Sequence, residues 1–214
     1  ERPGGHERLA AFYAERARGD VGLIVTGGIA PNASGCVTEN SARLTEETQV
    51  AEHRIITRAV HQEGAKICLQ VLHAGRYAFH KQLVAPSTIQ APINIFTPRA
   101  LTDQEVEQQI SDFVHCACLA RQAGYDGAEI MGSECDLANH RGLAALVALS
   151  AALAGRRPAL RLHVAGSGAG AEAEALRRRM TEMVPLVELH GQLAQPELAV
   201  LLRRCAVCVL PSFY

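Results

Sequence analysis

The sequence predicts an α/β fold, because short apolar runs alternate with amphipathic stretches along its 214 residues. Apolar runs without polar alternation are typical of strands that are covered on both faces. Stretches with helical periodicity fit between these runs, several of them with a Thr, Asp or Gly start and a Gly stop. This alternating order predicts parallel strands joined by right-handed helical crossovers.

Six apolar runs are predicted as strands and six stretches as helices. The strands are residues 21–28, 66–72, 127–132, 160–166, 187–191 and 207–211, and the helices are residues 6–18, 45–64, 103–124, 142–155, 171–183 and 195–205. Residues 80–100 are proline-rich and lack a helical period, which predicts a long loop after the second strand.

Composition argues against nucleic-acid binding and against insertion into a membrane. The net charge is -1, with 21 Lys and Arg against 22 Asp and Glu, so no basic surface for nucleic acid is expected. The longest apolar stretch, residues 143–154, is too short to cross a bilayer, and the amino end lacks the apolar core of a signal peptide. We therefore expect a cytoplasmic protein whose partners are small molecules, not nucleic acid or membrane.

The seven cysteines show no disulfide framework, so reduced thiols are expected. Cys205 and Cys208 form a C-x-x-C pair, but no second pair follows at the spacing of a zinc site. Packing is the favoured interpretation of this pair, and no metal site is predicted.

The first half carries several motifs in order: ERLAAFYAERARGDVGLIVTGGIAPNASG, EHRIITRAVHQEGAKICLQVLHAGRY, LVAPSTIQAPIN and ARQAGYDGAEIMGSE. Residues 7–134 resemble the Old Yellow Enzyme family, most closely its 2,4-dienoyl-CoA reductase branch. The resemblance implies part of a flavin-binding TIM barrel. It also implies hydride transfer from a nicotinamide through FMN to an activated alkene.

Candidate cofactor residues stand at the ends of two predicted strands. Gly27 and Gly28 lack side chains, so a planar ligand could approach the backbone there. The Gln70 amide could both donate to and accept from a pyrimidine edge. Tight packing of the glycines and a core glutamine are equally consistent with the residues alone. The resemblance places Gly28 and Gln70 at flavin contacts.

The resemblance also implies substrate-side roles for His73, Arg76 and Tyr77, which follow the second predicted strand. Asp136 occupies the position of the branch's catalytic tyrosine, and an ionised carboxylate is a poor proton donor near neutral pH. The family's first barrel strand would precede residue 1. We therefore expect weak FMN binding, NADPH as reductant only if the reductase interpretation holds, and no complete catalytic site.

From residue 137 to 214 the sequence resembles part of the donor-binding domain of retaining GT-B glycosyltransferases, with NHRGLAALVALSAAL, PALRLHVAGSGAGAEAEALRRR and VELHGQLAQPELAVLLRRCAVCVLPSFY in family order. This resemblance implies nucleotide-binding positions at Arg141, Gly166, Gly168 and Gly191. A glycine turn before a helix amino end favours phosphate.

Two features complicate that interpretation. Asp136 stands where the transferase family has an arginine, and its carboxylate would repel a diphosphate. In addition, Gly166, Gly168 and Ala171 fit a dinucleotide turn, with Glu188 about twenty residues on. A Rossmann-type dinucleotide site is therefore an alternative.

The sequence as a whole predicts a partial TIM barrel at residues 1–134, a seam at 135–141, and a partial Rossmann-like GT-B half at 142–214. Three parallel strands are expected on each side of the seam. The first hypothesis is a chimera of two enzyme fragments. The alternatives are an FMN- and NADPH-dependent ene-reductase and a nucleotide-sugar-binding module. Unpaired sheet edges also predict association between chains.

Overall fold

The computed structural model describes residues 4–131 and, beyond them, residues 162–165, 178, 187–191, 194, 196–197, 200 and 208–210. The chain divides into two units. One comprises residues 1–139 with 206–214, and the other comprises residues 140–205.

A four-stranded parallel sheet forms the centre of the first unit. Its strands are β1 (Leu23–Ile29), β2 (Lys66–Leu72), β5 (Gly127–Met131) and β8 (Cys208–Leu210). They are paired in the order β1-β2-β5-β8, so β1 and β8 are the outer strands. The predicted parallel α/β class is confirmed, and the strand positions agree with the prediction to within about two residues.

The position of β8 differs from the sequence-based expectation. Residues 207–211 belong to the stretch with transferase-like motifs, yet Glu129 of β5 pairs with Cys208, and Met131 pairs with Leu210. The long strands among the described residues therefore divide four and two, not three and three. The sequence of an apolar strand does not specify which strand it pairs with, because pairing is set by tertiary geometry.

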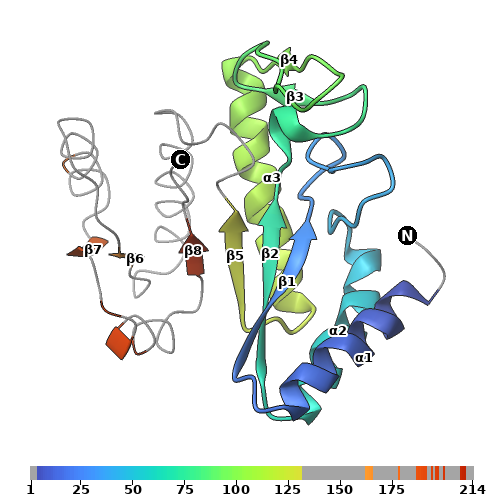
Figure 1. Cartoon of the computed structure of the whole chain (residues 1–214), viewed down its shortest axis with the longest axis vertical. Helices are drawn as coiled ribbons and strands as arrows, with labels where there is room; N and C mark the ends of the chain where they lie inside the picture. Colours follow the sequence, from blue (N-terminus) through green and yellow to red (C-terminus); the bar gives the residue numbers. More distant parts are fainter. Residues whose placement is uncertain are drawn as a thin grey trace. The chain divides into compact units, whose positions relative to one another are not determined.

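Three helices cover one face of this sheet (Figure 1). They are α1 (Gly5–Arg18), α2 (Val50–Gln62), which follows the 3-10 turn η1 (Glu47–Gln49), and α3 (Asp103–Gln122). The start of α3 is a capping box: the Glu105 amide donates to the Thr102 hydroxyl oxygen, and the Thr102 amide donates to the Glu105 carboxylate. The helix begins where the sequence predicts it.

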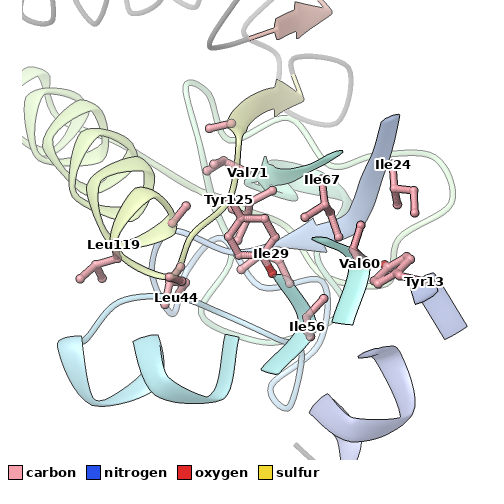
Figure 2. Close-up of a cluster of buried hydrophobic side chains, with 14 of the residues drawn as sticks. Tyr13, Ile24, Ile29, Leu44, Ile56, Val60, Ile67, Val71, Leu119 and Tyr125 are labelled. Atoms are coloured by element: carbon pink, nitrogen blue, oxygen red, sulfur yellow. The ribbon is translucent and has the colours of Figure 1, made fainter. Parts of the chain in front are cut away.

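The main core lies between these helices and the sheet (Figure 2). Alternate residues of β2, namely Ile67, Leu69 and Val71, are fully buried on this side. On the opposite face of the sheet, Leu23 and Val25 are 42% and 40% exposed. The described helices thus cover only one face of the sheet.

The proline-rich segment is mostly irregular, as predicted, but it contains two short strands that the sequence analysis did not anticipate. β3 (Val84–Ala85) and β4 (Arg99–Ala100) pair in parallel, and the 3-10 turn η2 (Gly75–Tyr77) precedes them. Asn94 holds the segment together, since its side-chain amide donates to the carbonyls of Arg76 and Ala78 at 2.9 and 2.7 Å. Two-residue strands leave no periodicity to detect.

The second unit contains β6 (Leu162–Ala165) and β7 (Val187–Gly191), which pair in parallel from Leu162 opposite Val187 to Ala165 opposite Gly191. Both strands lie inside the runs predicted from sequence. Asp136, Arg141, Gly166 and Gly168 lie outside the described residues, whereas Gly191 is the last residue of β7.

Candidate functional site

Two predicted flavin-contacting residues and one buried acid lie in one row across the four-stranded sheet. Gly28 of β1 is the register partner of Gln70 on β2, and Gln70 is the partner of Glu129 on β5. Register partners in parallel strands share a face, and their position alternates with that of Ile67, Leu69 and Val71. The row therefore lies on the face opposite the core, near the carboxyl ends of the strands, where ligands bind in parallel α/β folds.

A β-bulge precedes Gly28. Val25 pairs with Cys68 and Gly28 with Gln70, so two residues of β1 stand opposite one residue of β2. Two side-chain hydroxyl oxygens accept hydrogen bonds from backbone N–H groups at this bulge. The backbone N–H of Gln70 donates to Thr26 Oγ1 at 2.9 Å, and the backbone N–H of Gly27 donates to the Tyr13 hydroxyl oxygen at 3.1 Å. Bulges change the direction of a strand and are common next to active sites.

Gly27 and Gly28 differ in the space that a side chain would find at each position. A Cβ on Gly28 would come within 2.8 Å of Leu72 Cδ1, so the packing of Leu72 alone explains the glycine there. A Cβ on Gly27 would meet nothing within 4 Å. Both glycines are exposed and Gln70 is half-buried, so these residues offer open backbone beside a side-chain amide. This arrangement suits the flat edge of a heteroaromatic ring.

Glu129 is a buried acid in the same row. It is 1% exposed, and neither carboxylate oxygen has a hydrogen-bond partner among the residues that the structure describes. Burial raises the pKa of Glu129, and the nearby Gln70 amide partly opposes that rise. Glu129 was not among the residues predicted for the site, although a single charged residue in the apolar run GAEIM is a signal of a functional or strained position.

His73, which was predicted to face substrate beyond the end of β2, is buried. It is 5% exposed, and its Nδ1 accepts the Gly75 amide at 3.1 Å, so the neutral ring carries its proton on Nε2, which lies 3.4 Å from Ser34 Oγ. Burial lowers the pKa of His73 to about 4, although Asp112 favours the charged form. Gly35 packs on the ring, where a Cβ would come within 2.6 Å of His73 Cδ2. The imidazole thus joins the loops after β1 and β2.

A second polar group extends this junction to α3. The Asn32 amide donates to Gln109 Oε1 at 2.6 Å and to Asp112 Oδ2 at 2.7 Å, while Asn32 Oδ1 accepts the Gly35 amide at 2.9 Å. Asn32 therefore links the loop after β1 to the helix before β5. Sequence reasoning gave these residues no role, because their contacts join segments about eighty residues apart.

Arg76 and Tyr77 are the more accessible members of the predicted substrate-side set. Both are half-buried in η2, and the Arg76 guanidinium lies 5.3 Å from the centre of the Tyr77 ring. Arg76 Nη2 lies 3.5 Å from the Tyr77 hydroxyl oxygen. A cation over an aromatic ring keeps both side chains in defined positions.

Other histidines take structural positions. His53 is 2% exposed, and its Nδ1 lies 3.0 Å from the Tyr125 hydroxyl oxygen. His61 pairs with Asp126 at 2.7 Å on the surface. Within the described residues, no group of three or more His, Cys, Asp or Glu side chains could hold a metal ion. The same part of the chain has no helix long and apolar enough to span a membrane.

The fold is a βα-type segment of parallel strands, with the candidate row of Gly28, Gln70 and Glu129 near their carboxyl ends. The NADH:flavin oxidoreductase / NADH oxidase family matches residues 1–140. The chain therefore belongs to this family, which confirms the resemblance seen in the first half of the sequence.

Named relatives agree with this assignment. The chain is 38% identical over 132 residues to a metal reductase of Desulforamulus reducens, a match that covers 59% of this chain and 20% of that protein. It is 32% identical over 121 residues to an NADPH dehydrogenase of Bacillus subtilis, covering 56% and 36% of the two chains. The chain thus spans well under half the length of these relatives.

Solved structures show a similar fold. The Old Yellow Enzyme homologue from Zymomonas mobilis matches with a TM-score of 0.66 at 21% identity, over 97% of this chain and 73% of that one. A second Old Yellow Enzyme, TcOYE with pHBA, matches with a TM-score of 0.64 at 21% identity, over 87% and 66% of the chains. At this level of identity the likeness concerns the fold alone.

Proposed function

We propose that the chain forms the flavin-contacting part of an FMN- and NAD(P)H-dependent oxidoreductase that acts on activated alkenes. The observation that carries the proposal is the row of Gly28, Gln70 and Glu129 across three adjacent parallel strands, opposite the core. Family membership favours this alternative over the chimera as the first hypothesis.

FMN fits the residues of the row. Gly27 leaves open space where a side chain would stand, and Gly28 is exposed although Leu72 packs against it. The Gln70 side-chain amide both donates and accepts, which suits the alternating donors and acceptors of a flavin pyrimidine. When bound, the flavin supplies hydride transfer. The residues of the chain bind the ring, orient it and exclude water from one edge.

Arg76 and Tyr77 are proposed to contact substrate, since both are half-buried beyond the end of β2. His73 holds the loops in place, because its ring is buried and hydrogen-bonded to Gly75. The 2,4-dienoyl-CoA reductase branch and the preference for NADPH rest on sequence motifs. Asp136 at the tyrosine position makes protonation by this part of the chain inefficient.

A titration of the whole chain with FMN, followed by flavin fluorescence quenching, tests the proposal. We expect weak saturable binding, with little FMN retained through gel filtration. Gln70→Leu should weaken binding about tenfold, the consequence of losing about 1.4 kcal/mol of hydrogen bonding. Gln62→Leu, at an exposed helix end, is the control and should bind as wild type does. No saturable quenching by wild type would refute the proposal.

We propose as a second candidate that the second unit, residues 140–205, binds a nucleotide-sugar. The parallel pairing of β6 with β7 supports it, because the predicted glycine turn at Gly166 directly follows β6 and Gly191 ends β7. Stabilisation of the chain against heat by UDP-glucose or GDP-mannose, reduced in Arg141→Ala, would support this candidate. Equal stabilisation by NAD would favour the dinucleotide alternative.

A further inference from the structure

The β1 bulge is held by two hydroxyl groups that the sequence analysis did not single out. Tyr13 lies on α1 and is 7% exposed, and Thr26 lies within β1 and is 6% exposed. The Tyr13 hydroxyl oxygen accepts the Gly27 amide, and Thr26 Oγ1 accepts the Gln70 amide. Each hydroxyl oxygen therefore accepts a hydrogen bond from the backbone N–H of a predicted flavin-contacting residue.

These contacts replace bonds that a regular ladder would supply. A bulge leaves its extra residue without a partner strand bond, and an unpaired buried polar group is costly. The phenol reaches the bulge from a helix on the core side, while Gly27 and Gly28 are exposed. The Tyr13 side chain, which packs in the core, thereby fixes the position of the exposed backbone at Gly27 and Gly28.

We propose that the hydroxyls of Tyr13 and Thr26 are positioning groups for the flavin edge, acting through the Gly27 and Gln70 backbone. This inference rests on the proposed function. The Tyr13 ring packs in the main core and beside Phe12, with ring centres 5.3 Å apart. Tyr13→Phe therefore removes the hydrogen bond and keeps the ring, and Thr26→Val does the same for the threonine.

The chain offers a matched control for each variant. Tyr125 is 5% exposed in the same core, but its hydroxyl meets His53 Nδ1 at 3.0 Å. Thr57 is 1% exposed, and its hydroxyl donates to the Ala123 carbonyl at 2.7 Å. Tyr125→Phe and Thr57→Val each remove a buried hydroxyl interaction away from the bulge.

FMN affinity by fluorescence quenching and thermal stability are measured for wild type and all four variants. We expect Tyr13→Phe and Thr26→Val each to weaken FMN binding about tenfold, and the controls to lose stability to a similar extent with wild-type affinity. Amide hydrogen exchange without FMN should accelerate at Gly27 in Tyr13→Phe and not in Tyr125→Phe. If Tyr13→Phe does not fold, Thr26→Val against Thr57→Val decides the matter.

Two failures are distinguishable. Wild type that binds no FMN overturns the proposed function. Wild type that binds FMN, with bulge variants that match their controls in affinity, overturns the positioning role and leaves the proposed function standing.

Discussion

Gln70 and Glu129 are direct partners across β2 and β5, so a side-chain amide and a buried carboxyl group stand next to each other on the site face of the sheet. The Gln70 backbone amide is occupied by Thr26, and the Glu129 oxygens have no partner among the described residues. The stability of this pair therefore depends on the protonation state of Glu129.

Glu129→Gln should stabilise the protein at neutral pH. Burial raises the folded-state pKa of Glu129 above its ordinary value of 4.5. The folded state then holds a proton that the unfolded state has lost, so wild-type stability falls as pH rises through that window. We expect the variant to match wild type near pH 4 and to exceed it by about 1–3 kcal/mol at pH 8, measured by urea unfolding.

Glu105→Gln is the control of opposite sign. Hydrogen bonds from Arg99 and Thr102 lower the pKa of Glu105 to about 2. The carboxylate stabilises the fold above its unfolded pKa, and that contribution is lost as pH falls toward 2. Glu105→Gln should therefore be less stable than wild type at pH 7. A stabilised Glu105→Gln, or a Glu129→Gln without pH dependence, would contradict the assignment.

Gly28→Ala and Gly27→Ala should separate packing from ligand access. The new methyl at position 28 would lie 2.8 Å from Leu72, which should cost about 1–3 kcal/mol in overpacking. Position 27 has open space, so Gly27→Ala should keep wild-type stability and still weaken FMN binding. Thermal unfolding and FMN titration check both. Equal stability of the two variants would show that Leu72 does not constrain β1.

Buried His53 should make the protein lose stability on acidification, and buried His73 should act in the same direction. Burial lowers the pKa of His53 to about 4, so between pH 6.5 and 4 the unfolded state takes up a proton that the folded state does not. The double variant His53→Phe with Tyr125→Phe removes both hydrogen-bond partners. It should show a shallower fall of melting temperature between pH 7 and 4.5, and a parallel fall would exclude His53 as a cause.

Thr102→Ala should weaken the start of α3. Thr102 and Glu105 exchange the two hydrogen bonds of a capping box, and loss of such a cap costs about 1 kcal/mol. Ser111, whose hydroxyl donates to the Glu107 carbonyl inside the same helix, offers Ser111→Ala as a control with little expected effect. Chemical denaturation compares the two, and similar losses would argue against the cap.

Among the described residues, the sequence by itself determined the helices and the longer strands, but not the short strands β3 and β4. The run around Ile67, Leu69 and Val71 predicts a buried strand, and the helical period from residue 103 after a threonine predicts a helix start, because both signals are local. The motifs around Gly28 and Gln70 were specific enough to predict the flavin oxidoreductase family, which residues 1–140 match. The site residues inferred from those motifs remain predictions.

Only the tertiary structure decided how those elements meet. The pairing of β8 with β5, the bulge held by Tyr13, and the burial of His73 beneath Gly35 each join residues that are far apart in the sequence. The same is true of Glu129, because the absence of a hydrogen-bond partner for it among the described residues depends on what surrounds it in three dimensions. Local periodicity reports which residues are buried, whereas register and hydrogen-bond partners depend on the packing of whole elements.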